Sequence, residues 1–285
     1  MGDYLMQQRK RALLYLIHLL KTRKRAVNRT ILDKMLFVLQ QEYGLGELIK
    51  FYNFFPYDYG PFSNMFYLDL SDLESRGLMS EGFELMPDAV AEAEAAPEAV
   101  QRRISGLVDR FDSKDIVDYV YGRYPAYTVN SRLLAKVKRK ESPGLYTIGY
   151  EGKDIDLFLD MLIQNRIETV IDVRANPFSM SFSFIGQRLR HYLEKVGINY
   201  LHIPELGIPG ERRKNLSSEA DYQKLFGFYR ASILPNQMEM IRLLSDMANQ
   251  GRIALLCFEA DNNFCHRGVL SAELERIMGK KVTHL

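Results

Sequence analysis

The first third of the chain places apolar residues three and four positions apart in three segments, which predicts three amphipathic helices. The segments are RALLYLIHLLKT (11–22), TILDKMLFVLQQEYG (30–44) and SNMFYLDLSDLESRGL (63–78). A short hairpin is expected in MSEGFELM (79–86), directly after the third helix. The order of three helices followed by a small β element is typical of a winged-helix-like module.

The pattern changes after LLAKVKRKESPG (133–144), a basic segment whose Ser-Pro-Gly end is typical of a linker. Short β-rich runs then alternate with helical segments, which predicts right-handed crossovers and a parallel sheet. The runs are LYTIGY (145–150), ETVIDV (168–173), NYLHIP (199–204), RIALLCFEA (252–260) and KVTHL (281–285). We therefore expect an α/β fold with a mostly parallel, Rossmann-like sheet and flanking helices. A mainly α-helical, winged-helix-like domain precedes it, and the domains are 1–142 and 143–285.

Composition narrows the class of protein. A chain of 285 residues suits two domains, and no run of about 18 apolar residues is present. The only cysteines are Cys257 and Cys265, which favours a reducing, cytoplasmic location over a secreted disulfide scaffold. Two cysteines and scattered histidines do not form a recognisable metal-ligand pattern. We expect no metal, no cofactor and no membrane partner.

Positive charge is concentrated near the N-terminus, although the net charge of the whole chain is only +2. No acidic residue interrupts the basic run, which consists of Arg9, Lys10, Arg11, Lys21, Arg23, Lys24, Arg25 and Arg29. Such a run favours contact with nucleic-acid phosphates. The alternative is a helix face whose charges are balanced by acids elsewhere in the fold.

Polar residues follow the predicted strands, whose carboxyl ends meet at one edge of a parallel sheet. They are Tyr150, Glu151, Asp172, Arg174, Asn176, Glu259, Cys265, His266 and Arg267. Asp172 lies inside an apolar strand, where an unpaired carboxylate is costly, and Arg174 is its nearest candidate partner. Asp172 and Glu259 are candidates for acid/base catalysis. For Asp172 the alternative is a structural ion pair that fixes the loop.

Cys265, His266 and Arg267 open the last long helix, and a helix N-terminus lowers the pKa of a thiol and attracts anions. Cys265 is therefore a candidate nucleophile and Arg267 a candidate phosphate ligand. The alternatives are a small buried side chain and a structural salt bridge. Cys257 lies within an apolar strand and is interpreted as core. Arg188 is a candidate substrate ligand, because it lies among aromatic residues that either stack on a nucleotide base or belong to the core.

The motifs TIGYEG, VIDVRANPFS, LGIPG and LLCFEADNNFCHR occur in this order in the C-terminal half. With them, residues from Leu145 to Leu285 resemble the domain of unknown function 488 family. The resemblance implies an α/β fold with a site at the strand ends and leaves the reaction open. Its motif positions are Tyr150, Glu151, Asp172, Arg174, Asn176, Pro177, Gly207, Cys257, Glu259, Cys265, His266 and Arg267.

The N-terminal segment FFPYDYGPFSNMFYLDLSDLESRGLM is similar to Panacea-type antitoxin domains. That resemblance implies contacts with protein or nucleic acid, and members of both groups occur near defence genes. We expect an enzyme or sensor directed at a nucleotide or nucleic acid, with a phosphate-binding site at the strand ends and a role in phage defence or a toxin–antitoxin system. The alternative is a non-enzymatic DNA-binding regulator or an antitoxin-like module that binds a second protein.

Overall fold

The structure is a computed structural model that describes residues 6–132, 142–213 and 216–285. The chain divides into two compact units, Met1–Val137 and Lys138–Leu285. The linker expected from the sequence, 133–144, lies mostly outside the described residues. None of the helices in the described part of the chain is long and apolar enough to cross a membrane.

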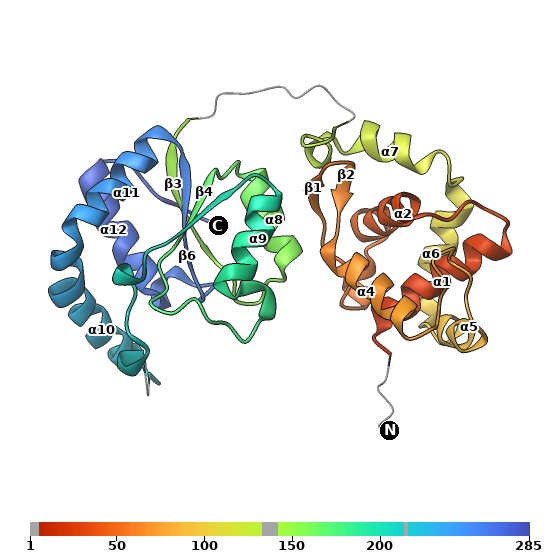
Figure 1. Cartoon of the computed structure of the whole chain (residues 1–285), viewed down its shortest axis with the longest axis horizontal. Coiled ribbons are helices and arrows are strands. Elements are labelled where there is room, and N and C mark those ends of the chain that lie inside the picture. The colour runs from red at the N-terminus through yellow and green to blue at the C-terminus, as the bar shows by residue number, and fades with distance from the viewer. Residues whose placement is uncertain (1–5, 133–141, 214–215) are drawn as a thin grey trace. The chain divides into compact units, whose positions relative to one another are not determined.

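The N-terminal unit is mainly helical (Figure 1). Its helices are α1 (Gln8–Thr22), α2 (Arg29–Gln41), α3 (Leu45–Leu48), α4 (Asn64–Ser75), α5 (Pro87–Glu94), α6 (Glu98–Arg110) and α7 (Ile116–Arg123). The three amphipathic helices predicted from apolar spacing are confirmed as α1, α2 and α4. Asn28 caps α2 by accepting a hydrogen bond from the backbone N–H of Ile31.

This unit contains two short β elements, of which the sequence predicted only the second. Strands β1 (Phe55–Tyr57) and β2 (Gly60–Phe62) pair before α4, and Gly60, which opens β2 directly after the turn, adopts a positive φ of 92°. The segment 79–86 contributes an isolated antiparallel bridge between Met79 and Leu85. Backbone hydrogen bonds from Ser80 to Glu84 and from Met86 to Leu78 close this segment into the predicted hairpin. The three predicted helices are thus followed by a small β element, with α3 and the β1–β2 pair inserted before α4. The winged-helix-like arrangement itself stays a prediction.

The basic run is largely neutralised within the N-terminal unit. Six of its eight side chains form ion pairs with acidic residues further along the chain: Arg9 with Asp69, Lys10 with Asp72, Arg11 with Glu92, Lys21 with Glu84, Arg23 with Asp109, and Arg29 with Glu74. Arg25 donates hydrogen bonds to the carbonyls of Val108 and Phe111. The structure therefore matches the interpretation in which acids elsewhere in the fold balance these charges.

The C-terminal unit contains the expected parallel sheet. Its strands are β3 (Gly144–Gly149), β4 (Thr169–Asp172), β5 (Asn199–His202), β6 (Arg252–Cys257) and β7 (Thr283–His284). All pairs are parallel, in the order β5-β4-β6-β3-β7. The flanking helices are α8 (Ile155–Gln164), α9 (Gly186–Lys195), α10 (Glu219–Phe228), α11 (Met238–Gln250) and α12 (His266–Met278).

Neighbouring strands of the sheet are followed by helices on opposite faces. Helices α8 and α9 cover one face, whereas α10, α11 and α12 cover the other (Figure 1). The central strand β6 continues into α12, but its neighbours β3 and β4 continue into α8 and α9 on the opposite face. Neighbouring strands whose connections diverge in this way leave a crevice at their carboxyl ends, where α/β proteins bind ligands.

Candidate functional site

Asp172 ends β4 and is fully buried. Both of its carboxylate oxygens accept hydrogen bonds: Oδ1 from Arg174 Nε at 2.8 Å, and Oδ2 from Arg174 Nη2 and the Tyr200 hydroxyl, each at 2.6 Å. The remaining guanidinium nitrogen of Arg174 donates to the Tyr150 hydroxyl and to the Phe184 carbonyl, each at 3.0 Å. The geometry is that of a satisfied structural ion pair, which was the alternative interpretation of Asp172.

The surroundings of this pair keep both partners in place. Burial disfavours the charged guanidinium, but attraction and hydrogen bonding from Asp172 and Tyr150 outweigh it, so the pKa of Arg174 is raised. The Tyr150 ring stacks on Phe184, with centroids 4.3 Å apart and planes inclined by 10°. Tyr200 is held by Asp172, and its burial raises the pKa of its hydroxyl. The Arg174 guanidinium, which was predicted to bind a phosphate, thus donates its hydrogen bonds to groups of the protein.

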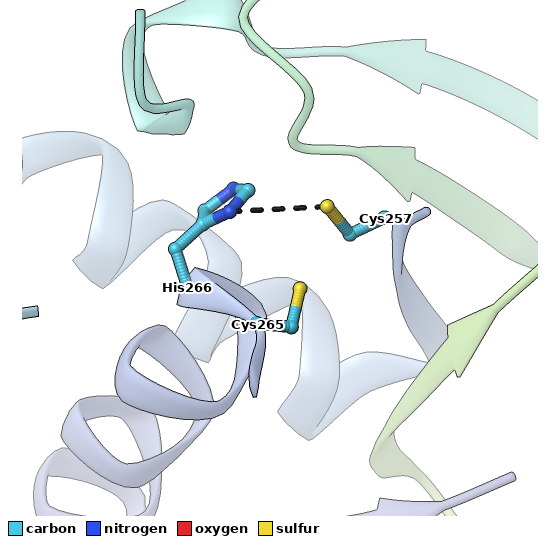
Figure 2. Close-up of side chains that lie close together, drawn as sticks. All are labelled: Cys257, Cys265 and His266. Atoms are coloured by element: carbon cyan, nitrogen blue, oxygen red, sulfur yellow. Dashed lines mark hydrogen bonds between the residues drawn. The ribbon is translucent and has the colours of Figure 1, made fainter. Parts of the chain in front are cut away.

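A second buried cluster lies at the junction of β6 and α12 (Figure 2). Cys257 is the last residue of β6, Cys265 is the N-cap residue of α12, and His266 is the first residue of that helix. Their side-chain ligand atoms all lie within 4.8 Å of one another, and Cys257 Sγ is 3.8 Å from His266 Nδ1. The three residues are between 0% and 2% exposed. We name them the thiol–imidazole cluster.

The pKa values of the two thiols of this cluster are shifted in opposite directions. The hydrogen bond from Cys265 lowers the pKa of the Cys257 thiol, and His266 and Arg213 add to this effect while burial opposes it. Burial and the Cys257 contact raise the pKa of Cys265. The predicted nucleophile, Cys265, is therefore the more protonated of the pair, and Cys257, which was interpreted as core, carries the thiolate character.

Glu259 lies beside the thiol–imidazole cluster. Its Oε2 atom is 3.3 Å from Cys257 Sγ, and its other oxygen forms an ion pair with Arg213. The Glu259 side chain is 12% exposed, so this carboxylate is reached by solvent more readily than Asp172. Of the two carboxylates predicted for acid/base work, Glu259 has the environment that suits it.

Arg267 fixes the backbone of the loop between β6 and α12. It is 1% exposed, and its guanidinium donates to the carbonyls of Glu259 at 2.9 Å and Ala260 at 3.3 Å. Gly149 packs against the same loop so closely that a Cβ there would lie 1.9 Å from the Glu259 carbonyl oxygen. Arg267 therefore occupies a loop-holding position rather than a solvent-facing anion site.

The other predicted ligand residues surround these clusters without joining them. Glu151 is exposed and accepts a hydrogen bond from the backbone N–H of Ala260 at 2.9 Å. Asn176 is exposed and accepts one from the backbone N–H of Phe178. Arg188 is exposed and lies over the Phe182 ring. Of these three, only Glu151 contacts the loop after β6.

A pocket of about 350 Å³ opens next to Cys265. Helix α10, the following turn, the loop after β6 and the first turns of α12 form its walls. Its lining residues are Glu219, Tyr222, Gln223, Phe226, Arg230, Asn262, Asn263, Phe264, Cys265, Gly268, Val269 and Ala272. Because Cys265 belongs to both, the pocket lies directly against the buried thiol–imidazole cluster.

Several residues of the cluster and the pocket were not predicted from the sequence. Cys257 looked like core because its neighbours are apolar, and only the motif LLCFEADNNFCHR singled it out. The expectation that cysteines and histidines do not cluster is wrong for Cys257, Cys265 and His266, because the loop after β6 folds back and joins positions that are separated in the sequence. Arg213 and Arg230 carried no signal, since single arginines in helical or polar segments are common.

Comparison with known proteins bears on part of the C-terminal unit. No curated protein and no solved structure matches the chain. The resemblance of the N-terminal half to Panacea-type antitoxin domains finds no support among the matching family models. One family model does match, and its range contains α8 to α11, β4 to β6 and most of α12. Residues 154–274 are thus similar to a domain of unknown function, DUF488.

Proposed function

We propose that the C-terminal unit is an enzyme or sensor for a nucleotide, either free or as part of a nucleic acid. The observation that carries the proposal is the pocket lined by Cys265, which lies against the buried thiol–imidazole cluster at the carboxyl edge of the sheet. The ligand occupies the pocket, and the cluster with Glu259 supplies the reacting or sensing groups. This location is the usual one for ligands of open α/β sheets.

The lining of the pocket suits a base with an attached phosphate. Tyr222 and Phe264 offer aromatic surface, with ring centroids 5.3 Å apart, on which a base can stack. Asn262 and Asn263 carry amides that donate and accept hydrogen bonds, as the polar edge of a base requires. Arg230 is exposed at the pocket and forms no ion pair among the described residues, so its guanidinium is available for a phosphate.

The proposal is tested by calorimetric titration of the full chain with AMP, CMP and ribose 5-phosphate. Arg230→Gln is expected to weaken the binding of AMP and ribose 5-phosphate alike by about tenfold, which corresponds to about 1.4 kcal/mol. Phe264→Ala is expected to weaken AMP and leave ribose 5-phosphate unchanged. Arg242→Gln removes a charge from an exposed position on α11 and serves as the matched control.

Two outcomes would refute this proposal. The first is that none of the nucleotides, nor a short single-stranded RNA or DNA, binds the wild-type protein. The second is that all of the variants bind as tightly as the wild type. The alternative of a DNA-binding regulator draws in part on the basic run, and six of the eight side chains of that run form ion pairs within the N-terminal unit.

A further inference from the structure

The thiol–imidazole cluster has the composition of a metal site. It combines two sulfur atoms and one imidazole nitrogen, without an oxygen donor among the three. Thiolate and imidazole donors select zinc and neighbouring transition metals, whereas Mg²⁺ and Ca²⁺ require oxygen ligands. The three donors are contributed by the end of β6 and the start of α12, which are rigid elements on the two sides of one loop.

The spacing of the donor atoms agrees with this chemistry. In a tetrahedral site with Zn–S and Zn–N bonds of about 2.3 and 2.1 Å, neighbouring ligand atoms lie roughly 3.6 Å apart. Cys257 Sγ and His266 Nδ1 are 3.8 Å apart, and the whole set lies within 4.8 Å. Small side-chain movements would therefore bring the three donors to these distances.

The groups around the donors orient them toward one point. His266 Nε2 lies 3.0 Å from the Val173 carbonyl oxygen, which places the ring proton on Nε2 and leaves the Nδ1 lone pair facing Cys257. Arg267 Nη1 lies 3.8 Å from Cys265 Sγ, where its positive charge favours a thiolate. A histidine fixed by a carbonyl on its far nitrogen is the usual arrangement for a metal ligand.

We propose that Cys257, Cys265 and His266 bind one Zn²⁺ ion, with Glu259 beside the fourth coordination position. Three protein ligands leave one position for water or for an oxygen of a bound molecule. Glu259 is held beside the cluster by its ion pair with Arg213, and its Oε2 atom lies 3.3 Å from Cys257 Sγ. This inference concerns the same cluster as the proposed function and rests on that function for the role of the pocket. Metal binding itself requires no nucleotide.

Metal content of the full chain tests the inference directly. We expect protein purified with zinc and then dialysed to retain one equivalent by elemental analysis. Titration of the metal-free protein with Co²⁺ should produce thiolate-to-cobalt charge-transfer absorption and the intense visible bands of a tetrahedral site. Cys257→Ser, Cys265→Ser and His266→Gln should each weaken binding at least tenfold, whereas His191→Gln, at an exposed position of α9, should not.

A second measurement covers the case in which the cysteine variants fail to fold. In the wild-type protein, bound Zn²⁺ should protect both thiols from alkylation by iodoacetamide, as read by mass spectrometry, and a chelator should remove the protection. The inference is overturned if the folded wild-type protein retains no metal and gives no charge-transfer band. A Cys257–Cys265 disulfide that persists in reductant overturns it as well. These measurements contain no nucleotide, so their failure is distinguishable from failure of the proposed function.

Discussion

The polar residues at the carboxyl edge of the sheet fall into two groups: an ion pair that stabilises the fold, and the thiol–imidazole cluster with Glu259. Asp172 and Arg174 satisfy each other inside the unit, with Tyr150 and Tyr200 completing their hydrogen bonds. The sequence predicted that Asp172 would need a partner and named the right one. It did not predict that both carboxylate oxygens would already accept hydrogen bonds within the protein. The hydrogen bond from Tyr200 depends on the register between β4 and β5, which the sequence does not reveal.

The structural role of Asp172 has a measurable consequence. Asp172→Asn is expected to destabilise the C-terminal unit by about 3 kcal/mol or more, because it leaves the Arg174 guanidinium buried without its counter-charge. Chemical denaturation followed by circular dichroism measures the change. Asp246→Asn, at an exposed position of α11, should change the free energy of unfolding by less than about 0.5 kcal/mol. Wild-type stability of Asp172→Asn would contradict the assignment of a structural ion pair.

At the scale of elements, periodicity predicted the helices and strands better than their arrangement. Helices α1, α2 and α4 and the strands of the sheet follow from apolar spacing. The hairpin of β1 and β2 was not predicted, because its aromatic, proline-containing strands resemble a turn-rich loop. Nor was the strand order, because it depends on which connections cross the sheet. The thiol–imidazole cluster was missed for a related reason: it forms only when the loop after β6 folds back.

Glu42, which follows α2, illustrates how one side chain joins three helical segments. It accepts hydrogen bonds from Arg110 at 2.7 Å, from Tyr119 at 2.5 Å and from Tyr124 at 2.7 Å. Burial alone would raise the pKa of this carboxyl, but the three hydrogen bonds outweigh it, and the pKa is lowered. A lowered pKa in the folded state means that the ionised carboxylate stabilises the fold.

The pH dependence of stability tests this network. The contribution of Glu42 should be complete above the unfolded-state pKa, near 4.5, and should disappear as the pH falls through the lower folded-state value. Glu42→Gln should therefore destabilise the N-terminal unit at pH 7, and its difference from the wild type should shrink below about pH 4.5. Denaturation curves at pH 7 and pH 3.5 measure this. A difference that is the same at both values, or that Glu98→Gln reproduces at its exposed ion pair, would contradict the role of Glu42.

For the whole molecule, the division of the apolar core determines what can fold alone. One buried cluster draws its residues from Ala12 to Val120, and another from Leu145 to Val282, so no residue is shared between them. The ion pairs of the basic run also join residues of the N-terminal unit only. Each unit therefore contains the interactions that are needed for its own stability.

Separate fragments 6–132 and 142–285 are accordingly expected to fold. Each should unfold in a single cooperative thermal transition, and their far-ultraviolet circular dichroism spectra should add up to that of the full chain. Fragment 142–285 should also retain the zinc and nucleotide binding of the intact protein. Loss of the cooperative transition in either fragment would show that the units depend on each other.

The donors of the thiol–imidazole cluster all lie in residues 257–266, one continuous stretch from the end of β6 to the first turn of α12. Such a site is inherited as a unit. A recombination event that moves this strand, loop and helix therefore moves every donor with it.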